Sequence, residues 1–376
     1  MTAVGIIFSN LFDNNLPELT KSRALASVPF ACRYRLIDFS LSNIVNSGID
    51  NVYVVTHQNY ESLMRHIGSG KDWDLARRKG GVKLLPPLMT AFASQGNASY
   101  NTRLESLKNI SHTIDRLTED YVVLSDCDSI CNINLREMLS QHEKTGADVT
   151  IACKNVDITP DKATSAVAVS FDENGKVNDV FARPDQVGNV NVSIHIMVIN
   201  RRYLQTILHD AISHNLNNLY LDVLAKNVGT AKIYAYEYDG FYSNTVTLQD
   251  YYDCSMTLLG NSEERNSLFN VRHRPVFTKV HNTPPTKYGV GSKVVNSLIA
   301  DGCIIEGTVE NSIIFRGVKI GKGTVVRNSI VFKDTYLGEN VSLEAVVTDK
   351  KVVIRDGVKL CGHALQPYFI EKGKMI

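Results

Sequence analysis

The feature that most constrains this chain is a repeat in its C-terminal quarter. An Asn-Ser-aliphatic triplet recurs at spacings of 15 and 17 residues, as Asn296-Ser297-Leu298, Asn311-Ser312-Ile313 and Asn328-Ser329-Ile330. Stretches built around a turn glycine and an aliphatic residue lie between and after the triplets, as at 316–321 and 357–362. Such periods stack as the faces of a triangular, left-handed parallel β-helix, in which each rung buries its Val or Ile on the rung below. An antiparallel sandwich is the alternative, but three in-phase triplets favour the β-helix.

The part of the chain before this repeat has a different periodicity. Short apolar runs alternate with amphipathic stretches of helical length, the pattern of parallel strands joined by crossover helices. We expect strands at 4–8, 51–56, 121–125 and 149–153, and helices at 39–47 and 135–144. The sequence therefore predicts an α/β domain with a mostly parallel, Rossmann-like sheet over 1–260, a linker over 261–288 and the β-helix over 289–376.

Composition limits the partners and the compartment. Hydrophobic residues make up 44% and charged residues 21%, as in a globular protein. The net charge is +1, so no overall field attracts nucleic acid or an anionic membrane, and neither is an expected partner. Seven thinly spread cysteines indicate a reducing compartment, and the apolar run at the N-terminus is too short for a signal peptide. We expect a cytoplasmic protein.

A set of motifs runs through the first domain. It begins with Ser27-Val28-Pro29-Phe30, the run 33–39, Leu41-Ser42-Asn43 and Asn46-Ser47-Gly48-Ile49. It continues with a strand and loop ending at Asp128, then Arg183-Pro184, Gly240-Phe241-Tyr242 and Thr247-Leu248. Together with the β-helix, these motifs resemble glucose-1-phosphate adenylyltransferase, also called ADP-glucose pyrophosphorylase, over essentially the whole chain. The resemblance implies a nucleotidyltransferase domain.

This resemblance implies a reaction with three structural requirements. The family joins glucose 1-phosphate to ATP, which releases pyrophosphate and forms ADP-glucose for glycogen or starch. The sugar phosphate attacks the α-phosphorus in line, so the protein supplies mainly positioning and charge neutralisation. It needs a glycine-rich loop whose backbone N–H groups hold the triphosphate, carboxylates that hold magnesium, and cations for the incoming phosphate.

The phosphate loop departs furthest from the family. Active relatives have Gly-Gly-x-Gly-x-Arg-Leu directly after the first strand, because only glycine lets the backbone approach a pyrophosphate closely. This chain has no glycine and no arginine over residues 9–16. We expect Leu11, Phe12 and Asp13 to fill the space of the triphosphate. Normal ATP turnover is therefore not expected.

The other two requirements are also degraded, so no intact catalytic set is expected. Leu25 stands where the family has a lysine, and Arg183 is the remnant of a Glu-Lys-Pro motif that reads the sugar phosphate. Asp128 aligns with the catalytic, metal-binding aspartate, but the second metal-binding aspartate is replaced by Asn244. One carboxylate remains where two are needed, so we expect no functional metal site here, and magnesium in a catalytic partner instead. Asp128 could alternatively cap the following turn.

Three arginines survive near the expected domain junction. By resemblance, Arg23, Arg33 and Arg35 lie near the β-helix, where phosphorylated sugar effectors bind in the family. Guanidinium groups suit phosphate recognition because they bind in a bidentate manner. The alternative is that these arginines form structural ion pairs at a domain or subunit interface. Both interpretations favour regulation or assembly over chemistry.

The resemblance therefore implies a diverged subunit of bacterial glycogen synthesis. Such a subunit is largely inactive alone and joins a catalytic subunit of glucose-1-phosphate adenylyltransferase in a mixed heterotetramer, with a phosphorylated sugar as a possible effector. One alternative is an active nucleotidyltransferase that works on a sugar phosphate through its altered loop. Another is an acyltransferase that uses the β-helix, but no conspicuous catalytic histidine lies within the repeats, and His363 lies only at their end.

Overall fold

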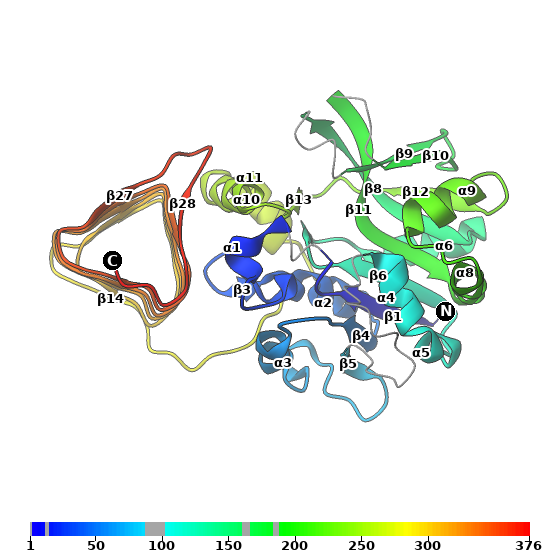
Figure 1. Ribbon diagram of the computed structural model, residues 1–376, viewed down its shortest axis with the longest axis horizontal. Coiled ribbons are helices and arrows are strands. Elements are labelled where there is room, and N and C mark those ends of the chain that lie inside the picture. The colour runs from blue at the N-terminus through cyan, green and yellow to red at the C-terminus, as the bar shows by residue number, and fades with distance from the viewer. Residues whose placement is uncertain (1, 12–14, 87–101, 160–165, 183–187) are drawn as a thin grey trace.

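The computed structural model describes residues 2–11, 15–86, 102–159, 166–182 and 188–376. Figure 1 shows two parts side by side, a domain with a sheet and helices and a triangular β-helix seen end-on. This arrangement confirms the predicted architecture, an α/β domain followed by a left-handed parallel β-helix. Within these described ranges, no helix combines the length and the apolar character that crossing a membrane requires.

A nine-stranded mixed sheet forms the centre of the first domain. The strands β5, β4, β1 and β6 are parallel neighbours, whereas β11 runs antiparallel to β6 and also pairs with β8 and β9. The strands are β1 (Ala3–Phe8), β4 (Asn51–Val55), β5 (Gly81–Leu85), β6 (Tyr121–Asp126), β8 (Val149–Ile158), β9 (Val167–Phe171), β10 (Val177–Ala182), β11 (Gly188–Asn200) and β12 (Ile233–Glu237). Two short pairs lie outside this sheet, β2 (Pro29–Phe30) with β3 (Tyr34–Arg35) and β7 (Ser129–Cys131) with β13 (Tyr242–Asn244).

Helices cover both faces of the sheet because each presents an apolar stripe to it. The helices α2 and α6 share one buried cluster with the sheet, and α4, α5 and α8 share the cluster on the opposite face. The helices are α1 (Pro17–Thr20), α2 (Leu36–Asn46), α3 (Glu61–Ile67), α4 (Arg103–Asn109), α5 (Ser111–Asp115), α6 (Leu135–Thr145), α8 (Arg201–Ser213), α9 (Ala225–Asn227), α10 (Leu248–Gly260) and α11 (Ser262–Phe269). Short turns of other helix types occur at η2 (Leu25–Ser27), η3 (Lys71–Trp73) and η4 (Leu219–Leu224). The strands and helices expected from periodicity are confirmed.

The β-helix consists of three five-stranded parallel sheets that form its three faces. The first face contains β14 (Lys287–Tyr288), β17 (Ile304–Ile305), β20 (Lys319–Ile320), β23 (Tyr336–Leu337) and β26 (Val353–Ile354). The second contains β15 (Lys293–Val295), β18 (Thr308–Glu310), β21 (Val325–Arg327), β24 (Ser342–Glu344) and β27 (Lys359–Cys361). The third contains β16 (Leu298–Ile299), β19 (Ile313–Ile314), β22 (Ile330–Val331), β25 (Val346–Thr348) and β28 (Tyr368–Ile370).

The repeated triplets form one corner of the triangle. The three asparagines have φ angles of 40°, 46° and 45°, a left-handed conformation that asparagine tolerates better than most residues. The serines form a ladder, because the Oγ of Ser297 accepts a hydrogen bond from the N–H of Ser312, at 3.2 Å, and the Oγ of Ser312 accepts one from Ser329, at 3.1 Å. The Oγ of Ser329 accepts from Val346, at 3.1 Å, in the next rung. The triplet thus supplies both the turn and the bond between rungs.

The stretch expected to be a linker, 261–288, has structure at both ends. It begins with α11, whose first turn is capped by the side chain of Asn261 and whose Leu268 is fully buried. It ends with β14, which pairs with β17 in the β-helix. The irregular connection is therefore shorter than the sequence suggested, because the apolar contact of Leu268 and the cap at Asn261 stabilise a helix there.

One apolar cluster joins the two domains. It combines Phe30 and Tyr251 of the first domain with Phe315, Phe332 and other residues in or directly after the strands of the third face of the β-helix. The hydroxyl of Tyr251 donates to the carbonyl of Pro29, at 2.7 Å, and that of the adjacent Tyr252 donates to the carbonyl of Asn328, at 2.7 Å. In Figure 1, α10 lies between the triangle and the sheet. Buried aromatic packing therefore holds the β-helix against the first domain.

Candidate functional site

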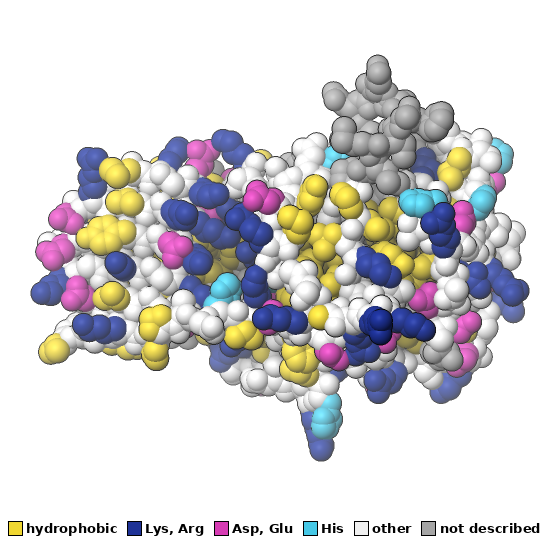
Figure 2. Space-filling model, turned by 90° about the horizontal axis from the view of Figure 1, so that it is seen from below, with side chains coloured by type: hydrophobic (Ala, Val, Ile, Leu, Met, Phe, Trp, Pro, Cys, Tyr) yellow, Lys and Arg dark blue, Asp and Glu magenta, His cyan; other side chains and the backbone are white. Residues whose placement is uncertain are grey.

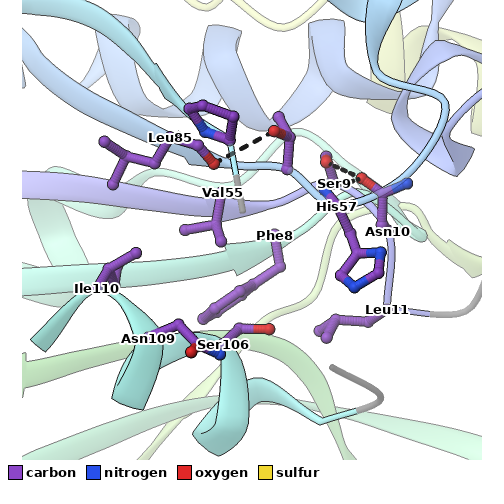
Figure 3. A pocket seen from close by; sticks show the side chains of 12 residues that line it. Phe8, Ser9, Asn10, Leu11, Val55, His57, Leu85, Ser106, Asn109 and Ile110 are labelled. Atoms are coloured by element: carbon purple, nitrogen blue, oxygen red, sulfur yellow. Dashed lines mark hydrogen bonds between the residues drawn. The ribbon is translucent and has the colours of Figure 1, made fainter. Parts of the chain in front are cut away.

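The segment after β1 lines a small cavity (Figure 3). The side chains of Phe8, Leu11 and His57 point toward this cavity, whose volume is about 20 Å³, close to that of a single water. Asn10 ties the segment to the loop after β4, since its Oδ1 accepts from the N–H of His57, at 3.2 Å, and its Nδ2 donates to the carbonyl of Gln58, at 3.0 Å. Leu11 lines this cavity, while Phe12 and Asp13, the other residues expected to fill the triphosphate space, lie outside the described residues.

Leu25 lies in the apolar interior. It begins η2, is 2% exposed, and belongs to the cluster that joins the two domains, together with Leu16, Leu19 and Phe39. A charged amine at this position would be removed from water among hydrocarbon side chains. The position that carries a lysine in the family pattern therefore cannot present a cation to a substrate in this packing.

Two carboxylates and an imidazole meet at the end of β6. Asp126 and Asp128 come from β6 and the turn that follows it, and His195 comes from the neighbouring β11. One ligand atom from each lies within 4.8 Å of the others, and all three side chains are buried. The Nδ1 of His195 lies 3.2 Å from Oδ2 of Asp128 and 3.8 Å from Oδ2 of Asp126. The family-aligned Asp128 thus bonds to side chains, those of His195 and Ser129.

Arg103 forms a buried ion pair with Asp126. Its Nη2 donates to Oδ2 of Asp126, and its guanidinium lies 5.2 Å from the ring centre of Tyr220. The Tyr220 hydroxyl in turn lies 2.9 Å from Oγ of Ser193, on β11. The hydrogen bond to Asp126 and the stacking on the Tyr220 ring therefore hold the guanidinium at the carboxylates.

The electrostatics of the cluster follow from burial and these contacts. Burial alone would raise the pKa of Asp128, but the charge and hydrogen bond of His195, with the charge of Arg103, hold it below its ordinary value. Burial raises the pKa of Asp126, and the contact with Arg103 opposes that shift. Burial alone would lower the pKa of Arg103, but Asp126 raises it, so the guanidinium stays charged. The cluster carries its own positive charge.

The donor set does not fit the magnesium ion that the family pattern implies. Magnesium takes oxygen ligands in a near-octahedral shell. Here the guanidinium of Arg103 bonds to Oδ2 of Asp126, and the imidazole of His195 bonds to Oδ2 of Asp128. Asn244, whose strand pairs with the residue after Asp128, offers a buried Oδ1 without a hydrogen-bond partner among the described residues, but an amide brings no charge.

A pocket of about 220 Å³ opens beside the cluster. His195, Asn244, Tyr242 and Asp250 contribute to its walls. Arg183, expected to be the remnant of the sugar-phosphate site, lies outside the described residues.

A strongly basic pocket lies where the β-helix meets the first domain. On the face drawn in Figure 2, Lys and Arg side chains gather at this junction. The pocket has a volume of about 430 Å³, and acidic side chains in its lining are Glu61 and Asp334. The Lys and Arg residues that line it are Arg23, Arg35, Arg65, Lys279, Lys333, Lys350, Lys351 and Lys372. This excess of positive charge is suited to a multiply charged anion.

The three arginines singled out in the sequence have different environments. Arg23 is buried and binds both carboxylate oxygens of Asp349, at 2.8 and 2.7 Å, which makes it an ion pair between the two domains. Its Nη1 is buried and has no hydrogen-bond partner among the described residues. Arg35 lines the pocket and donates to the carbonyl and Oγ of Ser62. Arg33 is exposed, lies over the ring of Tyr34, and is not among the residues that line the pocket.

The lysines of this pocket were not identified from the sequence, although the repeat contains the signal. Arg316, Lys333 and Lys350 follow one another at intervals of 17 residues, the spacing of the rungs, and so occupy one column of the β-helix. Burial, then the charges of Arg23 and Arg35, lowers the pKa of Lys350 to about 7. Burial and nearby cations also lower the pKa of His281 to about 4. Both shifts mark a site where positive charges crowd together.

Comparison with known proteins identifies the family of each of the two domains. A family model described as nucleotidyl transferase matches residues 13–261, and one described as GlmU-like, C-terminal hexapeptide matches residues 283–365. The chain is 35% identical over 373 residues to the glycogen biosynthesis protein GlgD of Bacillus subtilis (strain 168), with 98% of this chain and 96% of that protein covered. It is 33% identical over 326 residues to the glucose-1-phosphate adenylyltransferase of Clostridium acetobutylicum, with 86% and 84% covered. The chain therefore belongs to the glucose-1-phosphate adenylyltransferase family of nucleotidyl transferases.

Proposed function

We propose that this chain is a regulatory or assembly subunit of glucose-1-phosphate adenylyltransferase in glycogen biosynthesis. It is largely inactive alone and joins a catalytic subunit, which converts ATP and glucose 1-phosphate to ADP-glucose and pyrophosphate with magnesium. The resemblance over nearly the whole chain to a glycogen biosynthesis protein and to glucose-1-phosphate adenylyltransferases supports the pathway.

The observation that carries the proposal is the position of the charges that could bind phosphate. Leu25 is buried among apolar side chains at the lysine position, and the cavity after β1 is close to the volume of one water. Among the described residues, eight Lys and Arg side chains line the pocket at the domain junction, whereas Arg103, which lies at the carboxylates of β6, is already paired with Asp126. A chain that catalyses phosphoryl chemistry needs its cations at the reacting phosphates.

We further propose that the basic junction pocket, with Arg35 and Lys350, binds a phosphorylated sugar effector. Arg23 contributes through its buried Nη1, while its other nitrogen holds Asp349. An anion bound here contacts both domains, because Arg35 comes from the first domain and Lys350 from the β-helix. Its binding energy therefore acts on the junction between them.

The experiment is a pyrophosphate-release assay with ATP, glucose 1-phosphate and magnesium. The chain is assayed alone, then mixed with a catalytic subunit of the family, with and without phosphorylated sugars. We expect the isolated chain to show less than about 1% of an ordinary enzyme rate of about ten per second. We expect it to change the partner's kcat, KM or effector response, and to form a mixed tetramer in light scattering.

Two outcomes would contradict the proposal. Turnover by the isolated chain at ordinary rates would favour the alternative, an active nucleotidyltransferase with an altered loop. A partner whose mass and kinetics do not change on mixing would exclude a regulatory role. A matched pair of variants tests the effector site, since Arg35→Ala should blunt the effector response, whereas Arg33→Ala, outside the pocket, should preserve it.

A further inference from the structure

The carboxylates at the end of β6 need a positive partner in any folded state of this chain. Asp126 and Asp128 are buried. One carboxylate oxygen of each lies within 4.8 Å of the other and of a ring nitrogen of His195. Two buried carboxylates this close destabilise one another unless a cation or a proton compensates them. In a metal-dependent enzyme of this fold, a divalent ion provides the compensation.

In this chain, side chains from two separate elements provide it. Arg103, at the start of α4, bonds to Oδ2 of Asp126, and its guanidinium lies over the ring of Tyr220. Its side chain is only 12% exposed, so it has exchanged most of its contacts with water for these contacts. A guanidinium that is buried, stacked and paired at the same time is a built feature of the site.

His195 reaches the second carboxylate through an unusual backbone conformation. It has a φ of 59°, which is rare for residues other than glycine, and the pairing of β11 with β8 is irregular between Ser193 and Met197. This irregularity accompanies a ring orientation that places Nδ1 3.2 Å from Oδ2 of Asp128. Backbone strain kept at a buried polar contact indicates a specific role for that side chain.

We infer that Arg103 and His195 are internal substitutes for the divalent metal, so that the carboxylate cluster of this chain binds neither magnesium nor manganese. The guanidinium takes the charge-compensating role at Asp126, and the imidazole takes the coordinating position at Asp128. Metal-dependent chemistry is thus blocked at the carboxylates themselves, separately from the altered loop after β1. The inference deepens the proposed inactivity of the chain, but it concerns metal binding and is measured without substrates or a partner subunit.

The test is a titration of the full chain with Mn²⁺, in which electron paramagnetic resonance measures the free ion. We expect no stoichiometric binding by the wild-type chain up to about 1 mM, a range that includes sensor-type carboxylate sites. His195→Gly removes the imidazole and suits the positive φ, and Arg103→Met in the same chain removes the second competitor. We expect the single variant to gain one Mn²⁺ site, and the double variant to bind at least about tenfold more tightly than the single variant.

Two further variants identify the ligands. Asp128→Asn, added to His195→Gly, should abolish the gained site. His209→Ala is the matched control, because His209 forms an exposed pair of the same length, 3.2 Å, with Asp115, and its loss should create no site. Should Arg103→Met unfold the chain, Arg103→Met with Asp126→Asn keeps the cluster balanced, and adding His195→Gly to it should yield weaker Mn²⁺ binding than His195→Gly alone.

The outcomes separate this inference from the proposed function. Stoichiometric Mn²⁺ binding by the wild-type chain that Asp128→Asn abolishes would overturn the inference, even if the chain is inactive. Failure of folded His195→Gly to gain a site would also overturn it. Turnover by the isolated chain would instead contradict the regulatory proposal. The Mn²⁺ titration would still decide the inference about the metal site.

Discussion

Arg23 and Asp349 form a buried ion pair across the domain junction, although 326 positions separate them in the chain. One guanidinium nitrogen binds both carboxylate oxygens, and neither side chain is significantly exposed. The same guanidinium lines the basic pocket. The sequence left a structural and an effector interpretation of Arg23 open. The ion pair through Nη2 agrees with the structural one, and the Nη1 atom at the pocket is the part that the effector proposal uses.

The ion pair predicts a large loss of stability when one partner is removed. Arg23→Met leaves Asp349 buried without its counter-charge, and breaking a buried pair in this way costs about 3–5 kcal/mol. The double variant Arg23→Met with Asp349→Leu replaces both charges with apolar groups and should recover most of that loss. Chemical denaturation monitored by circular dichroism measures the free energy of unfolding.

An exposed pair in the same region serves as the control. Lys21 lies 3.3 Å from Glu371 and is 77% exposed, so Lys21→Met should cost less than about 1 kcal/mol. A loss for Arg23→Met as small as that for Lys21→Met would show that the pair does not hold the junction.

Replacing Leu25 by the lysine that the family has at this position gives another prediction. Because the side chain is packed in the cluster that joins the domains, Leu25→Lys should destabilise the chain by more than about 3 kcal/mol and restore no turnover alone. Leu25→Met, which keeps the volume and the apolar character, should cost less than about 1.5 kcal/mol. Thermal unfolding and the pyrophosphate assay measure the two effects. A stable and active Leu25→Lys variant would contradict this account of the position.

The basic pocket should bind anions in a pH-dependent way. Burial and neighbouring cations lower the pKa of Lys350 to about 7, so the amine is charged below that pH and neutral above it. Affinity for an anion should therefore fall by roughly tenfold between pH 6 and pH 8. Sulfate is the suitable probe because its charge is constant over this range, whereas a phosphate monoester loses charge below about pH 6. Calorimetric titration at each pH measures the affinity.

Variants assign this pH dependence. Lys350→Gln should remove most of the change between pH 6 and pH 8, while Lys322→Gln, an exposed lysine of the β-helix outside the pocket, should leave it intact. His281 does not contribute in this range because its pKa is lowered to about 4. An unaltered pH profile in Lys350→Gln would exclude the lysine as the titrating group.

The serine ladder predicts a graded effect along the β-helix. Ser312→Ala removes a buried acceptor of the Ser329 N–H and should cost about 1–3 kcal/mol. Ser297→Ala, at the partly exposed end of the same ladder, should cost less, because water can replace the lost contact. Chemical denaturation of the two variants gives the comparison. Equal losses would mean that burial does not set the strength of the ladder.

The sequence predicted the fold where the pattern is local and repeated. The triplets at 296, 311 and 328 predicted the β-helix because each one supplies a corner residue with a positive φ and a hydrogen bond between rungs. Apolar runs such as 4–8 predicted the central sheet because a strand buried on both faces is a continuous run of apolar residues. Both signals lie within a few residues of chain.

The site was less predictable because its contacts join distant segments. Asp128 was recognised from its alignment, but Arg103 and His195 come from other elements, and no spacing in the sequence connects them to it. The helix within 261–288 was missed because its single buried contact, at Leu268, makes no periodic stripe. Lys350 could have been found, since its rung spacing from Lys333 places the two amines in one column.

That column has an evolutionary consequence. Successive rungs of the β-helix each contribute one side chain at the same position around the triangle, and the backbone bonds between rungs do not depend on what that side chain is. If the junction pocket binds an anion as proposed, exchanges of single residues in this column would change which anion binds, without disturbing the sheet or its carboxylates.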